Sequence, residues 1–127
     1  MRLLGIDYGR AKIGLAVSEG ILAEPFSVIR YEDEKELFEN IKAIADKERI
    51  DKVVVGVSEG KSEEDARSFG DKLRSMGIEG IFFDETLSTV SAQELARQAQ
   101  IGRKKRKALE DAFAASVMLQ SFLDSNV

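Results

Sequence analysis

The segment DKVVVGV, residues 51–57, constrains the fold more than any other stretch of the sequence, because it has no polar residue between Val53 and Val57. Successive residues of a strand face opposite sides of the sheet, so a uniformly apolar strand must be covered on both faces. Strands of this kind belong to parallel sheets that are flanked by helices. The segment therefore predicts an α/β protein in which it forms a central strand.

The rest of the chain supplies elements that suit such a sheet. Short connections between the first three apolar segments favour an antiparallel meander, and Pro25 makes the third segment an edge or irregular strand. Helices between the later strands imply parallel crossovers onto a mixed sheet.

The chain has 127 residues and no linker or repeat, so we expect one domain over residues 1–127. The expected strands are 2–6, 12–18, 21–30, 51–57 and 78–83, and the expected helices are 34–48, 62–77, one that starts near 88–89 or at 91, and roughly 107–123.

The composition excludes several classes of catalytic site. Without cysteine there is no disulfide, thiolate nucleophile or cysteine-type zinc site, and without histidine there is no Ser-His-Asp triad. Any catalysis must therefore rest on carboxylates, Lys, Arg, Ser, Thr or Tyr, with or without a hard metal such as Mg²⁺ or Mn²⁺. No apolar run reaches the roughly 18 residues of a membrane span, and no export signal is visible, so we expect a cytoplasmic protein without membrane partners.

Asp7 follows the first apolar segment, and three glycines lie near it in the sequence, namely Gly5, Gly9 and Gly14. Glycine allows backbone or a phosphate to approach closely, and sites in sheets of this kind lie at strand ends. The simpler interpretation is an Asx-turn over the residues DYG. We favour a functional carboxylate at Asp7.

Asp84 and Glu85 follow another expected strand. Because neighbouring strand residues face opposite ways, we expect only one of the two to face the same site as Asp7. The other would cap the helix that follows.

Asp111 lies in the final apolar helix, where a buried acid is costly unless it is paired or bound to a metal. Its neighbours Ala114 and Ala115 are small enough to let the helix lie close to the sheet. The alternative is an acid that complements the helix dipole, a role that Glu110 fits better. Carboxylates from two strand ends and this helix would form a cage for divalent metals, which can hydrolyse a phosphodiester without any His or Cys.

A basic run precedes Asp111. Residues 97–107 carry six positive charges and no acid, although the whole chain has a net charge of −4. Such a run is either a solvated loop or a contact for a phosphate backbone, and both interpretations stay open here. The candidate nucleic-acid-binding residues are Arg103, Lys104, Lys105, Arg106 and Lys107.

Four segments in order, GIDYGRAKIGLAVSE, VVVGV, DETLST and KKRKALEDAFAASVMLQSFL, together resemble the YqgF family, also called RuvX. The resemblance spans nearly the whole chain. Its members are ribonuclease-H-like proteins related to the RuvC resolvases, and they are described as pre-16S rRNA nucleases or Holliday-junction resolvases. Thr86 departs from the family pattern, which usually has Arg there, and Lys12 stands where Arg is common; Lys12 joins the nucleic-acid-binding candidates.

The resemblance implies a ribonuclease-H-like mixed five-stranded sheet in the order 3-2-1-4-5, flanked by helices. It implies a metal site of Asp7, Glu85 and Asp111 for Mg²⁺ or Mn²⁺, with Asp84 in reserve. The expected function is metal-dependent cleavage of structured nucleic acid, either RNA at the 5′ end of precursor 16S rRNA or branched DNA, by a monomer or a homodimer. The alternatives are a noncatalytic nucleic-acid or ribosome-associated binding module and, less favoured, an actin-like nucleotide-binding protein.

Overall fold

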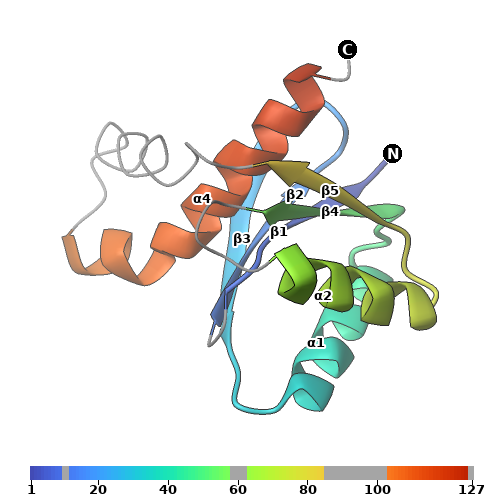
Figure 1. The fold of residues 1–127 in the computed structure, drawn as a ribbon. Helices are drawn as coiled ribbons and strands as arrows, with labels where there is room; N and C mark the ends of the chain where they lie inside the picture. The colour runs from blue at the N-terminus through green and yellow to red at the C-terminus, as the bar shows by residue number, and fades with distance from the viewer. Residues whose placement is uncertain (10–11, 58–62, 85–102, 126–127) are drawn as a thin grey trace.

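The computed structural model describes residues 1–9, 12–57, 63–84 and 103–125, and Figure 1 shows a sheet with helices on both faces. Within these residues five strands form one sheet in the order β3-β2-β1-β4-β5, which confirms the expected order. The first three strands pair antiparallel, and β4 pairs parallel with both β1 and β5, as the meander and the crossovers predicted. The element bounds are β1 Leu3–Asp7, β2 Lys12–Ser18, β3 Ala23–Arg30, α1 Glu34–Lys47, β4 Lys52–Val57, α2 Glu63–Ser75, β5 Gly80–Asp84 and α4 Arg103–Ser125.

β4 is buried on both faces, as its sequence predicted. Val53 and Val55 pack into the cluster beneath α1 and α2, whereas Val54 packs into the cluster beneath α4. All three side chains are fully buried. The strand therefore needs helices on both sides of the sheet, and the chain places α1 and α2 on one face and α4 on the other (Figure 1).

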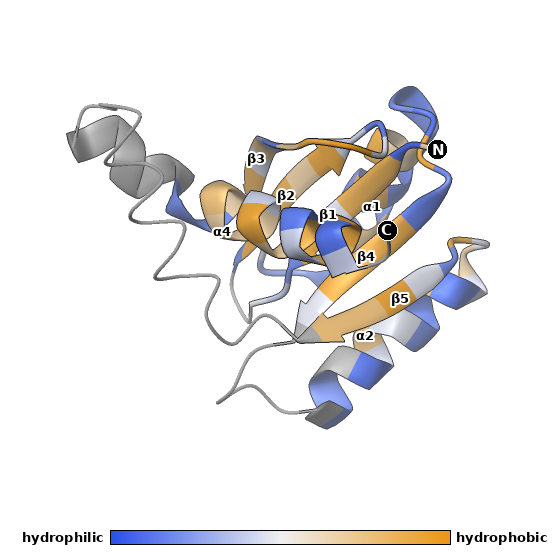
Figure 2. Cartoon of the chain, turned by 90° about the horizontal axis from the view of Figure 1, so that it is seen from above, coloured by the Kyte–Doolittle hydropathy of each residue, from blue (hydrophilic) through white to orange (hydrophobic). Residues whose placement is uncertain are grey.

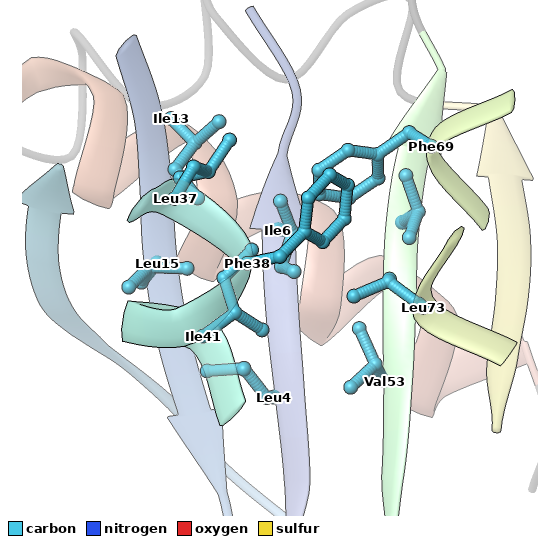
Figure 3. Close-up of a cluster of buried hydrophobic side chains, with 11 residues drawn as sticks. Leu4, Ile6, Ile13, Leu15, Leu37, Phe38, Ile41, Val53, Phe69 and Leu73 are labelled. Atoms are coloured by element: carbon cyan, nitrogen blue, oxygen red, sulfur yellow. The ribbon is translucent and has the colours of Figure 1, made fainter. Parts of the chain in front are cut away.

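The larger core lies between the sheet and the pair α1 and α2 (Figure 3). Asp33 begins α1 as its N-cap, because its side chain accepts a hydrogen bond from the Lys35 amide at 3.0 Å. Phe38 of α1 and Phe69 of α2 contact each other with ring centroids 5.1 Å apart, which joins the two helices above the sheet. The buried members of this core are Leu4, Ile6, Ile13, Leu15, Leu37, Phe38, Ile41, Val53, Val55, Phe69 and Leu73.

α4 covers the opposite face, over β3, β2 and β1 (Figure 2). Two glycines let the helix approach closely. A Cβ atom at Gly14 would lie 1.9 Å from the carbonyl oxygen of Asp111, and one at Gly5 would lie 3.0 Å from the Cβ of Leu119. Both glycines therefore give room to the backbone of α4 rather than to a phosphate, and the close approach expected from the alanines after Asp111 is confirmed.

Most element boundaries differ from the sequence prediction by one or two residues, and the start of α4 differs by four. α4 begins at Arg103 rather than near residue 107, so the basic run from Arg103 is helical and, of the two open interpretations, the solvated loop is wrong for these residues. Lys and Arg are good helix formers, which favours a helix here. β3 begins at Ala23 rather than residue 21; it is an edge strand, as Pro25 predicted, with an irregular register opposite that proline.

The helix expected near residues 88–91 lies outside the described residues, as does Thr86. No helix within the described ranges is long and apolar enough to cross a membrane.

Candidate active site

Asp7 is the last residue of β1, at the carboxyl edge of the sheet's two parallel inner strands. Leu3 and Gly5 of the same strand face α4, and the period of two places Asp7 on that face as well. Its partners across the sheet are Gly14 on β2 and Gly56 on β4, and neither of them has a side chain. Asp7 is partly buried, and this glycine-flanked strip of the sheet is covered on its Gly14 side by the backbone of α4.

Asp111 reaches the same strip from α4. Its carbonyl oxygen lies directly over Gly14, the residue that pairs with Asp7 in the sheet. One glycine therefore brings together the strand that carries Asp7 and the helix turn that carries Asp111. The two positions are 104 residues apart in the chain, so only the packing of α4 on β2 makes them neighbours.

Lys12 lies at the start of β2 and pairs with Asp111, with 2.9 Å between its Nζ and Oδ2 of the aspartate. The side chains of Lys12 and Asp111 are 43% and 30% exposed, so this ion pair is open to solvent on one side. An exposed pair of this kind contributes at most about 1 kcal/mol to stability. Its consequence for the site is that an ammonium group already neutralises one of the two carboxylates.

The remaining predicted acids lie at or beyond the end of β5. Asp84 is the last residue of the strand and pairs with Val57 on β4; its side chain lies outside the described part of the structure, and so does Glu85. Phe83 occupies the same row of the sheet as Asp7 and Gly56, and it packs on the α4 face. The structure thus brings the end of β5 to the same edge of the sheet as Asp7.

The basic run forms the first turns of α4. Arg103 to Lys107 precede Asp111 by eight to four residues, which corresponds to roughly 6–12 Å along a helix. In Figure 1 these turns extend past the sheet. The first turns of α4 therefore lie within a few nucleotide spacings of Asp111 along the helix.

Two tyrosines beside Asp7 were not singled out from the sequence. Tyr8 lies next to Asp7 and contacts Phe69, with ring centroids 4.7 Å apart. The Tyr31 hydroxyl donates a 2.6 Å hydrogen bond to the carbonyl oxygen of Gly9. No sequence signal could have found this contact, because it joins the end of β3 to the turn after β1.

A divalent metal suits the donor set. Asp7 and Asp111 offer carboxylate oxygens, which are the ligands that Mg²⁺ and Mn²⁺ prefer, on one strip of the sheet. Among the residues that the structure describes, no group of three or more acidic or other metal-binding side chains is close enough to hold a metal. A complete cage would therefore need a further ligand in addition to Asp7 and Asp111.

Comparison with known proteins decides the family. The model of the family described as "RuvX: Holliday junction resolvase" matches residues 1–125. The chain belongs to the RuvX family. Among its RuvX relatives is a protein of Halothermothrix orenii named "Putative pre-16S rRNA nuclease", 38% identical over 98% of this chain and 95% of that protein.

Solved structures support the ribonuclease-H-like fold. The Fowlpox virus Holliday junction resolvase aligns over all of both chains with a TM-score of 0.65 at 10% sequence identity. RuvC of Thermus thermophilus, solved with a Holliday junction, aligns over 100% of this chain and 97% of that one, with a TM-score of 0.58 and 20% identity. At these identities the likeness establishes the architecture of this RuvX protein and not its chemistry.

Proposed function

We propose that this protein is a nuclease that requires a divalent metal and hydrolyses phosphodiester bonds in structured nucleic acid. The observation that carries the proposal is the meeting of Asp7 and Asp111 at Gly14, at the carboxyl end of β1 in a ribonuclease-H-like sheet of a RuvX family member. The name of the Halothermothrix orenii relative favours the processing of precursor 16S rRNA, and the family description favours Holliday junctions. Both substrates are structured nucleic acids with a polyanionic backbone.

Glu85 is our candidate for the third carboxylate. The period of two along β5 supports this choice, because Phe83 packs on the α4 face and the residue two positions later in an extended chain would return to that face. The same alternation makes Asp84 the weaker candidate.

Asp7 and Asp111, with Glu85, would hold Mg²⁺ or Mn²⁺. A bound ion of this kind supplies a Lewis acid that lowers the pKa of water and neutralises charge on the phosphate. Asp7 would be the ligand held most firmly, since it belongs to a strand paired on both sides. Lys12 neutralises Asp111 while the metal is absent, and near a bound phosphate its ammonium would face a second anion.

The cationic first turns of α4 would grip the backbone of the nucleic acid next to the scissile bond. Half or more of the hydrogen bonds in protein–DNA complexes go to phosphate and sugar, and such contacts position a substrate without reading its sequence. In this proposal the carboxylates carry out cleavage, and the basic residues supply the affinity for nucleic acid.

The direct test is a cleavage assay on a panel of labelled substrates with Mg²⁺, Mn²⁺ or EDTA. The panel contains a four-way DNA junction, duplex DNA, single-stranded RNA and a precursor-rRNA fragment that spans the 5′ end of 16S rRNA. We expect metal-dependent cleavage of at least one structured substrate, and the preferred substrate identifies the biological role. Binding without cleavage on the whole panel would contradict the proposal and favour a noncatalytic binding module.

Replacing two basic residues of α4 tests the proposed grip. The double variant Lys104→Gln/Lys105→Gln should bind nucleic acid more weakly, and on duplex DNA the slope of log K against log salt should become shallower by about 0.9 for each phosphate that the variant no longer neutralises. The measurement is fluorescence anisotropy at several salt concentrations. Lys42→Gln is the matched control, because Lys42 lines a pocket with Lys52 and Glu79 at the opposite end of the sheet. An unchanged slope in the double variant would contradict the proposed contact of these lysines with the phosphate backbone.

A further inference from the structure

Tyr31 bonds the backbone just after Asp7. Its hydroxyl donates a 2.6 Å hydrogen bond to the carbonyl oxygen of Gly9, two residues after Asp7. The turn is tight at this point, since a Cβ atom at Gly9 would lie 2.5 Å from the carbonyl oxygen of Lys12. The hydrogen bond from Tyr31 therefore holds a residue that closely follows Asp7 and lies against the Lys12 carbonyl, and the ammonium of Lys12 pairs with Asp111.

Tyr31 lies between two regular elements, β3 and α1. Arg30, the residue before it, pairs with Lys12 in the sheet, and Asp33, two residues after it, is the N-cap of α1. Tyr31 also packs against the larger core. Tyr31 is thus held between β3 and α1 and against the core, and from this position its hydroxyl bonds the Gly9 carbonyl.

The surroundings keep this hydroxyl protonated. Burial, together with the neighbouring Tyr8 and a hydrogen bond between the two phenols, raises the pKa of Tyr31 to about 12. The raised pKa keeps the phenol a donor throughout the neutral pH range. The phenol therefore remains able to donate to the Gly9 carbonyl at neutral pH.

We propose that Tyr31 is a positioning residue of the active site, which fixes Asp7 and Lys12 through its hydrogen bond to the Gly9 carbonyl. The inference rests on the proposed nuclease function and extends it to a residue 24 positions from Asp7 in the sequence. Tyr31 touches neither metal nor substrate in this account. It acts as the outer-shell groups of metal sites do, by restricting the orientation of a ligand.

Tyr31→Phe removes the hydroxyl and keeps the ring in the core. We expect its Mn²⁺ affinity by calorimetry and its kcat for cleavage to fall roughly 10–100-fold, which is the usual effect of losing an outer-shell partner. The KM for nucleic acid should stay near the wild-type value, because the basic turns of α4 are untouched. Tyr8→Phe is the comparison variant: Tyr8 is the only other tyrosine of the chain, and this variant removes the bond between the two phenols while it keeps the Tyr31 hydroxyl that donates to Gly9.

The outcomes separate this inference from the function on which it rests. A Tyr31→Phe protein that melts at a lower temperature but keeps its Mn²⁺ affinity and kcat would show that the hydrogen bond is only structural, and the proposed nuclease would stand. An equal loss in Tyr8→Phe would assign the effect to the hydrogen bond between the two phenols and overturn the role of the Gly9 bond. A wild-type protein that neither binds Mn²⁺ nor cleaves would overturn the proposed function and this inference with it.

Discussion

The variant Asp7→Asn should lose cleavage almost entirely while it keeps its fold and its affinity for nucleic acid. An amide is a poor ligand for a hard cation, and Asp7 lies at the strand end with glycines on both sides, so no neighbouring side chain of its row in the sheet can replace it. The loss should exceed the roughly 10–100-fold that follows from removing an outer-shell partner of a metal ligand. Single-turnover cleavage of the preferred substrate at saturating metal measures it.

Binding must be measured in the same variant. Removing a negative charge from a surface that faces a polyanion should leave the affinity unchanged or slightly higher. Glu24→Gln provides the matched control, because it makes the same change from acid to amide on an exposed residue at the opposite end of the sheet, at the start of β3. Cleavage at the wild-type rate by Asp7→Asn would contradict the assignment of the active site.

The variant Gly14→Ala should destabilise the protein and abolish cleavage together. The added Cβ would lie 1.9 Å from the carbonyl oxygen of Asp111 and 3.0 Å from the amide nitrogen of Ala112, both of them backbone atoms that no side-chain rotation can move. Overpacking of a core lowers the free energy of unfolding by about 1–3 kcal/mol and occasionally more. A clash between two backbones should cost about 3 kcal/mol or more. Urea unfolding monitored by circular dichroism measures the loss, provided that the m-value is unchanged.

Gly80→Ala is the control for this prediction. Gly80 begins β5, and nothing lies within 4 Å of the position that its Cβ would take. A surface substitution of this kind should change stability by no more than about 0.5 kcal/mol. If Gly14→Ala were as stable and as active as Gly80→Ala, then α4 could not lie on β2 at this residue, and Asp7 and Asp111 would not be neighbours.

The sheet could be predicted from the sequence because its signals are local. Three consecutive valines require a strand that is covered on both faces, and Pro25 predicts an edge strand from its missing amide hydrogen. The alanines after Asp111 predicted a close approach of the last helix. The structure adds that Gly14 is the surface that this helix meets.

The contacts that organise the site could not be predicted in the same way. The ion pair between Lys12 and Asp111 and the hydrogen bond from Tyr31 to Gly9 each depend on where two distant elements meet, and no periodicity encodes that meeting. The start of α4 was misjudged for a different reason: charge runs are typical of loops, yet Lys and Arg favour helices, and a helix that extends beyond the sheet needs no apolar stripe. Glu85, the third proposed ligand, lies outside the described residues and stays a prediction.

The central claim is that Asp7 and Asp111 serve one metal site, and titration of Mn²⁺ into the protein by calorimetry tests it most directly. The series contains the wild type, Asp7→Asn, Asp111→Asn and the double variant, with Glu24→Gln as control. We expect the wild type and the control to bind Mn²⁺ and each single variant to lose most of that affinity. The Mn²⁺ affinity of the double variant should be only slightly lower than that of the single variant that binds Mn²⁺ less tightly. The reason is that ligands of one site are coupled rather than additive. No binding by the wild type, or losses that add as they do for independent sites, would contradict the account.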